Sequence, residues 1–168
     1  VQIVVGYDLG TQTGWCMLGV RDQKAELDDV GLINLARSKF EGGGMQMVKF
    51  DNELNSILSA VRFGSDKMYA AFEQTRFFGP RSGPDAPQMF GALSMKLMEV
   101  CERHRVPYQG IAPSTILAEA TGHGRAPKGE RKQVLMESMS KRYPGHKFQT
   151  YDVSDAVATA DAFARKMG

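Results

Sequence analysis

The stretch that indicates the fold is VVGYDLGT, residues 4–11. It is an apolar run that ends in a carboxylate, Asp8, and is closed by Gly10. A short apolar run bounded by glycine is typical of a buried strand. Two further segments place acids beside apolar residues in the same way: AAFEQ at residues 70–74 and DVSDA at residues 152–156. Because an ionised carboxylate is costly to remove from water, acids gathered beside a core indicate a compensating cation, and oxygen ligands favour a divalent metal ion.

The length and composition are typical of a single domain, residues 1–168. No apolar run approaches a membrane span, so we expect an intracellular protein of the cytoplasm, an organelle matrix or a phage-infected cell. Cys16 and Cys101 lack paired spacing and are expected to be buried thiols. The net charge of +2 is uninformative, but residues 122–147 hold seven Lys or Arg and two Glu. This basic cluster is either a phosphate-binding surface or a solvated helix face.

The pattern predicts strands first and then alternating helices and strands, which is the order of an α/β fold. The first three strands are expected to form an antiparallel meander, and a crossover helix then leads to parallel strands. The expected strands are residues 2–8, 13–20, 29–36, 67–73 and 108–111, and the expected helices are residues 45–61, 87–104, 114–120, 129–142 and 152–166.

The last helix permits a geometric test. At 100° per residue its apolar residues form one stripe that faces a core, and Asp152 and Asp155 are neighbours on the edge of that stripe. Asp161 falls about 180° from Asp152, so we expect it on the solvent side and exclude it as a ligand. A helix-capping carboxylate is the alternative interpretation of Asp152.

The two acids at strand ends are expected to meet. If the strands at residues 2–8 and 67–73 are parallel neighbours, Asp8 and Glu73 emerge at the same carboxyl edge, where α/β sheets generally place ligands. Taken alone, Asp8 is equally consistent with a turn residue before Gly10.

In order and spacing, these segments resemble the RuvC-type Holliday junction resolvases of the ribonuclease H-like superfamily. The resemblance spans nearly the whole chain and is carried by Gly6-x-Asp8-x-Gly10 with Thr13-Gly14, Phe72-Glu73-Gln74, Gly122-x-Gly124-x-Ala126-x-Lys128, and Asp152-x-x-Asp155-Ala156-x-Ala158. It implies a ribonuclease H-like fold with a five-stranded mixed sheet of order 3-2-1-4-5, three strands antiparallel and then two parallel, flanked by helices.

The resemblance also implies an activity. A member of this family would be a metal-dependent endodeoxyribonuclease that resolves four-way (Holliday) DNA junctions by paired nicks, leaving 5′-phosphate and 3′-hydroxyl ends. The implied catalytic tetrad is Asp8, Glu73, Asp152 and Asp155, which would hold two Mg²⁺ or Mn²⁺ ions. Lys128 matches a family lysine beside the scissile phosphate, although a lysine in a polar loop is commonly only solvated.

Branched DNA is the implied partner. The expected DNA-binding residues are Arg76, Phe77, Phe78, Arg81, Arg125, Lys128, Arg131 and Lys132. The family places an aromatic residue after the Glu that wedges into the open junction; here two adjacent phenylalanines lie nearby, shifted by a residue. They suit stacking on unpaired bases, or they anchor the loop. A second family lysine is missing near residues 116–117, so the site is expected to depend more on Arg125, Lys128 or Arg131.

The helix at residues 87–104 has a second apolar surface, formed by Gly91, Ala92, Met95 and Met98. Such a surface indicates an isologous contact between two copies, as in the homodimers of the resolvase family, unless the period of the helix is misjudged.

The sequence leaves three other functions open. The chain could be a broader branched-DNA or flap endonuclease, or a non-catalytic nucleic-acid-binding relative. Residues 7–13 also resemble a phosphate loop of the sugar kinase and actin superfamily, which needs a second domain and a second loop.

Overall fold

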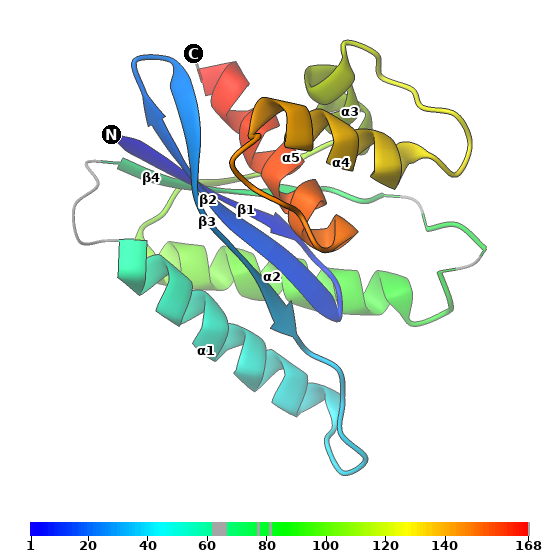
Figure 1. Cartoon of the computed structure of the whole chain (residues 1–168). Coiled ribbons are helices and arrows are strands. Elements are labelled where there is room, and N and C mark those ends of the chain that lie inside the picture. The colour runs from blue at the N-terminus through cyan, green and yellow to red at the C-terminus, as the bar shows by residue number, and fades with distance from the viewer. Residues whose placement is uncertain (62–66, 77, 81, 168) are drawn as a thin grey trace.

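The computed structural model describes residues 1–61, 67–76, 78–80 and 82–167. Its elements, in chain order, are β1 (Gln2–Asp8), β2 (Gln12–Arg21), β3 (Lys24–Asn34), α1 (Gly43–Val61), β4 (Lys67–Glu73), α2 (Ala86–His104), β5 (Tyr108–Ile111), α3 (Pro113–Thr121), α4 (Arg131–Arg142) and α5 (Tyr151–Met167). The strands form one sheet of order β3-β2-β1-β4-β5, shown in Figure 1. β1, β2 and β3 pair antiparallel, and β4 and β5 are added in parallel, so the predicted order is confirmed.

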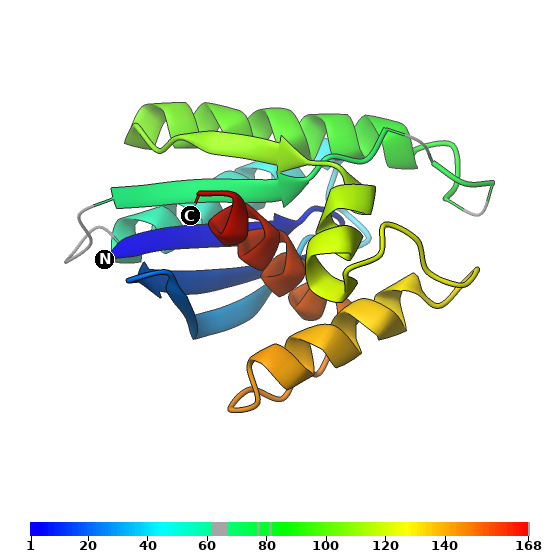
Figure 2. The same ribbon diagram turned by 90° about the horizontal axis from the view of Figure 1, so that it is seen from above.

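The helices form a layer on each face of the sheet. α1 and α2 cover one face, and α5 lies on the other with α3 and α4 packed outside it (Figures 1 and 2). Two buried apolar clusters fill the spaces between these layers, one centred on Tyr7, Phe50 and Leu97 and the other on Leu18 and Val157. Cys16 and Cys101 are buried free thiols, as predicted. Within the described residues, none of the helices combines the length and apolar character that a membrane span requires.

One expected element is wrong in its bounds. β3 begins at Lys24, whereas the polar residues before position 29 were expected to form a connection. The chain turns within two residues, because Asp22 and Gln23 both have left-handed backbone angles (φ 50° and 63°), the geometry of a tight hairpin. The polar residues after this turn, 24–28, belong to β3, which is an edge strand where charged side chains face solvent. Every other expected element matches to within two residues at each end.

Helix α5 rests directly on the sheet because two strand residues lack side chains. A Cβ atom on Gly6 of β1 would overlap the carbonyl oxygen of Ala156, and one on Gly14 of β2 would overlap the carbonyl oxygen of Asp152. Gly14 pairs with Asp8 in the sheet. The first turn of α5 is therefore seated beside the end of β1, and this seating positions the site.

Candidate active site

The four expected acids come together at one edge of the sheet. Asp8 is the last residue of β1 and Glu73 the last residue of β4. The parallel register pairs Tyr7 with Phe72, so the two acids are the next residues on neighbouring strands. Asp152 and Asp155 lie in the first turns of α5, which begins over the end of β1 (Figure 1). The shared edge inferred from the sequence is thus the arrangement found in the structure.

The acids perturb one another strongly. Burial raises the pKa of Asp8 well above its usual range, and the charges of Asp155, Glu73 and Asp152 raise it further. A hydrogen bond with the side chain of Asp152 acts in the same direction. Asp8 is therefore held in its protonated form to a higher pH than an exposed aspartate.

Asp155 is the most buried of the four acids, with 4% of its surface exposed. Burial raises the pKa of Asp155 to about 7; the charges of Glu73 and Asp152 raise it too, while those of Arg131 and Lys132 lower it. Its Oδ1 atom is buried without a hydrogen-bond partner. A buried oxygen of this kind is costly unless something binds it, and a cation is the partner that a carboxylate requires.

The chemistry of the donor set fits a divalent metal ion. The candidate ligands are carboxylate oxygens, which Mg²⁺ and Mn²⁺ favour, and one of them is the buried, unpartnered oxygen of Asp155. Over the part of the chain that the structure describes, no three His, Cys, Asp or Glu side chains are already arranged to hold a metal ion. Glu73 is engaged elsewhere, by an arginine.

Arg131, at the start of α4, pairs with one of the acids. Its Nη2 atom donates a hydrogen bond to Oε2 of Glu73 at 2.8 Å and a longer one, at 3.4 Å, to the carbonyl oxygen of Pro113. Both side chains of the ion pair are largely buried. Sequence reasoning placed Arg131 among the phosphate contacts and missed this pairing, since no local pattern connects a strand end with a helix start 58 positions later.

The other basic residues of the expected interface lie between α3 and α4 and at the start of α4. Arg125 and Lys128 are exposed in the segment between α3 and α4, and Lys132 is exposed in the first turn of α4. Lys132 acts on Asp155, whose pKa it lowers. Lys128 forms no ion pair with any residue that the structure describes. Its neighbour Gly129 has a positive φ of 80°, which allows the chain to turn into α4.

The loop between β4 and α2 contains the remaining expected contacts. Arg76 is exposed. Phe78 is half-buried, and its ring lies 5.9 Å from that of Phe90 on α2, tilted by 59°. Phe78 thus anchors the loop to the helix, the second of the two interpretations left open above. Phe77 and Arg81 lie outside the described residues.

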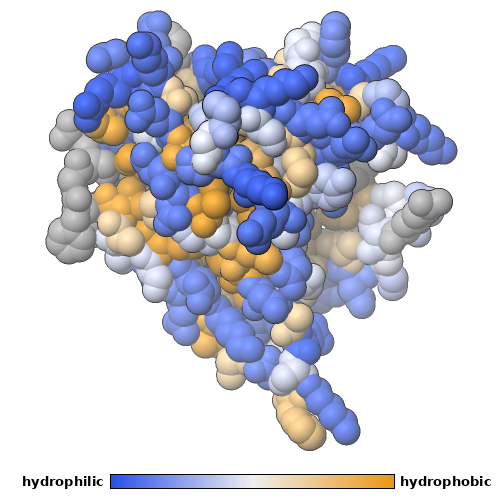
Figure 3. Space-filling model, viewed as in Figure 1, coloured by the Kyte–Doolittle hydropathy of each residue, from blue (hydrophilic) through white to orange (hydrophobic). Residues whose placement is uncertain are grey.

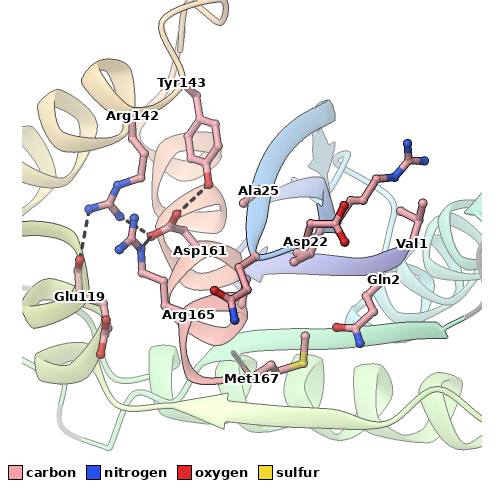
Figure 4. Close-up of a pocket in the computed structure, with 14 residues that line it drawn as sticks. Val1, Gln2, Asp22, Ala25, Glu119, Arg142, Tyr143, Asp161, Arg165 and Met167 are labelled. Carbon is pink, nitrogen blue, oxygen red and sulfur yellow. Dashed lines mark hydrogen bonds and ion pairs between the residues drawn. The ribbon is translucent and has the colours of Figure 1, made fainter.

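Asp161 was expected in solvent, and this was wrong. Only 2% of its surface is exposed, because α3 and α4 cover the side of α5 that faces away from the sheet. The hydroxyl of Tyr143 donates a hydrogen bond to Oδ1 at 2.7 Å, and Arg142 and Arg165 both pair with Oδ2 (Figure 4). Arg142 also donates to two carbonyls at the end of α3, at 3.3 Å each. Asp161 and its partner Arg142 therefore connect α3, α4 and α5, beside an open cavity of about 870 Å³.

Comparison with known proteins identifies the fold. No protein-family model matches the sequence, and neither does any curated protein. Among solved structures, RuvC of Thermus thermophilus superposes with a TM-score of 0.80 over 98% of this chain and 95% of its own, at 18% identity. T. thermophilus RuvC in complex with Holliday junction substrate gives 0.78 over 98% and 96%, at 20% identity. The yeast mitochondrial Holliday junction resolvase gives 0.58 over 96% and 77%, at 15% identity.

The chain therefore has a ribonuclease H-like fold. Within that class, its five-stranded sheet and surrounding helices have the arrangement of RuvC, over almost the full length of both chains.

Proposed function

We propose that the protein is a metal-dependent, structure-selective endodeoxyribonuclease that resolves four-way DNA junctions by paired nicks. The observation that carries this proposal is the meeting of Asp8, Glu73, Asp152 and Asp155 at one sheet edge, with a buried carboxylate oxygen that lacks a partner. The fold supports it, since RuvC has been described in complex with Holliday junction substrate. The expected products have a 5′-phosphate and a 3′-hydroxyl.

The four acids would hold two Mg²⁺ or Mn²⁺ ions, which supply an activated water and stabilise the leaving oxygen when bound. Without such charge the cluster repels a DNA phosphate. Arg131 neutralises Glu73 in the described form, so its guanidinium must share that carboxylate with an incoming cation or leave it. Once released, Arg131 would contact a phosphate at the same edge.

The basic residues divide into two roles. Arg125, Arg131 and Lys132 would bind backbone phosphates and hold the DNA in register, which makes binding dependent on salt. Lys128 would lie next to the scissile phosphate and stabilise charge that develops only during cleavage. Arg76 would contact the branch point from the β4–α2 loop, whose position Phe78 fixes by packing on Phe90.

The test is cleavage of a labelled panel of four-way junction, flap, fork and linear duplex in Mg²⁺. We expect symmetric nicks in the junction, and no cleavage by Asp8→Asn or Glu73→Gln, because each removes ligand charge with little change of volume. Asp85→Asn is the matched control: it removes the same charge from an exposed residue whose side chain forms no capping hydrogen bond. Normal cleavage by Asp8→Asn would refute the assignment.

The panel also separates the proposal from its alternatives. Efficient cleavage of flaps and forks, with no preference for the four-way junction, would identify a broader branched-DNA nuclease. Tight junction binding without cleavage in Mg²⁺ or Mn²⁺ would identify a non-catalytic binding protein. Each result would replace the function proposed above.

We further propose that the protein acts as a homodimer, because a four-way junction offers two equivalent strands to two equivalent sites. The outer surface of α2 supports this: Met95 is 64% exposed, and Ala92 and Gly91 beside it are too small to obstruct a facing helix. Sedimentation of the protein and of Met95→Glu tests the interface. We expect a dimer that the glutamate dissociates, and an unchanged sedimentation coefficient would exclude this surface.

A further inference from the structure

The loop between β3 and α1 exposes an aromatic ring. We define the tip as residues 37–41, which contain Phe40. Phe40 is 92% exposed, more than any other large apolar side chain among the residues described. Figure 3 shows this end of the molecule, the lowest in the view of Figure 1, as a narrow projection in which apolar and hydrophilic atoms lie side by side. A single exposed apolar side chain is common on protein surfaces, so the surroundings of Phe40 decide what its exposure indicates.

The base of the tip is firmly held. Gln46 of α1 is 2% exposed; its Nε2 donates to the carbonyl of Leu35 at 2.7 Å and its Oε1 accepts from Nε of Arg37 at 2.8 Å. On the other side, Nζ of Lys49 donates to both carboxylate oxygens of Glu41 at 2.8 Å. Both ends of the tip are thus fixed to α1. The fold therefore presents Phe40 to solvent on an anchored support.

The charges around Phe40 are positive. Glu41 is already paired with Lys49, which leaves the exposed side chains of Arg37 and Lys39 as the charge of the tip. Nζ of Lys39 lies 5.8 Å from the centroid of the Phe40 ring, within the range of a cation–π contact. An aromatic face flanked by cations is suited to a flat base that is attached to a phosphate.

The tip also lies at the same end of the sheet as the acid cluster. β3 ends at Asn34, which pairs with Gln12 at the start of β2, and the same end of β2 pairs Gly14 with Asp8. The tip therefore continues from the edge that carries the acids, on the side of β1 away from the β4–α2 loop.

We propose that the tip is a second nucleic-acid contact, in which Phe40 stacks on an exposed nucleobase of branched DNA while Lys39 and Arg37 bind the flanking phosphates. This inference rests on the function proposed above. It gives the DNA contacts on both sides of the acid cluster, one from the β4–α2 loop and one from the tip.

The charges favour DNA over a second copy of the chain. A symmetric contact between two tips would bring Arg37 and Lys39 against their own copies, and like charges repel. The hollow between α1 and α2 offers the tip no free acid either, because its Asp51 is paired with Lys96 and Arg103. A polyanion satisfies both cations and the ring.

The experiment measures binding without cleavage, in EDTA, of a four-way junction and a linear duplex of equal length. We expect Phe40→Ala to weaken junction binding on the order of tenfold, with little effect on duplex, because only the junction offers unstacked bases. Leu32→Ala is the matched control, because it truncates a different exposed apolar residue, which lies on β3, and it should change neither affinity. Lys39→Ala should reduce the salt dependence by about one unit for both DNAs.

Phe40→Trp adds a direct readout. We expect its fluorescence to be quenched when unlabelled junction binds, after subtraction of the signal of Trp15 measured in the parent protein. If the parent binds junction and Phe40→Ala binds equally well with no quenching of Phe40→Trp, this inference fails and the proposed function stands. If the parent binds no branched DNA, the proposed function fails and the inference with it. A change of sedimentation coefficient in Phe40→Ala would identify a protein contact and overturn the inference.

Discussion

Asp155→Asn should stabilise the metal-free protein while abolishing its activity. The ordinary pKa of the aspartate is 3.8, and burial raises it to about 7 in the folded state. Because the folded pKa is raised, the stability that Asp155 contributes to the protein is fully present below about pH 4 and is lost as the pH rises through 7. The folded and unfolded pKa values differ by about three units, so ionisation of Asp155 lowers the free energy of unfolding by about 4 kcal/mol at pH 8. Roughly 2 kcal/mol of this loss has already occurred at pH 5.

The asparagine carries no charge at any of these pH values. We therefore expect the variant to exceed the parent in free energy of unfolding by up to about 4 kcal/mol at pH 8 and by about half of that at pH 5. Urea unfolding in EDTA at the two pH values, followed by circular dichroism, measures both differences. Asp85→Asn, the same substitution at an exposed acid, is the matched control at both pH values. A stability difference that is the same at pH 5 and pH 8 would refute the buried-charge explanation.

Four further predictions concern the seating of α5, the Asp161 cluster, Lys128 and Arg131. Gly6→Ala should cost about 1–3 kcal/mol of stability, because the added methyl group would displace α5, and cleavage should fall with it; Gly44→Ala, where a Cβ meets no atom within 4 Å, is the control in thermal unfolding. Asp161→Asn should cost about 1–3 kcal/mol of stability, since it removes the counter-charge of the partly buried Arg142, while at low temperature the folded fraction should cleave normally; a complete loss of cleavage in folded protein would contradict a structural role. Lys128→Ala should lower single-turnover cleavage on the order of a hundredfold without weakening junction binding, and equal losses of affinity and turnover would contradict this role. Arg131→Ala should tighten Mn²⁺ binding in calorimetry because it frees Glu73, and an unchanged Mn²⁺ affinity would contradict the pairing.

The sheet and the acid edge could be predicted because their signals are local. Each acid at a strand end follows an apolar run of strand length, and parallel strands bring such ends together wherever they are neighbours. The start of β3 was missed for a related reason: an edge strand has one solvated side, so its polar residues resemble a turn.

The burial of Asp161 was missed because a helical wheel shows which residues lie opposite one another but not what covers them. A usable signal was present. Alanines occupy positions 156, 158, 160, 162 and 164, and Ala158 and Ala164 lie about 60° to either side of Asp161 around the helix. Small residues on both sides of an acid leave room for other helices to pack over it. The pairing of Arg131 with Glu73 had no such signal, since it depends on the path of the chain between α3 and α4.

The seating of α5 on Gly6 and Gly14 also determines when the acid cluster can form during synthesis. A nascent chain that has reached only residue 150 contains β1 and β4, and so Asp8 and Glu73, but the sheet face that α5 covers is still bare. The helix that buries this face also delivers Asp152 and Asp155. Completion of the core and assembly of the four-acid cluster are therefore a single event, and a fragment that ends before α5 lacks two of the four proposed metal ligands.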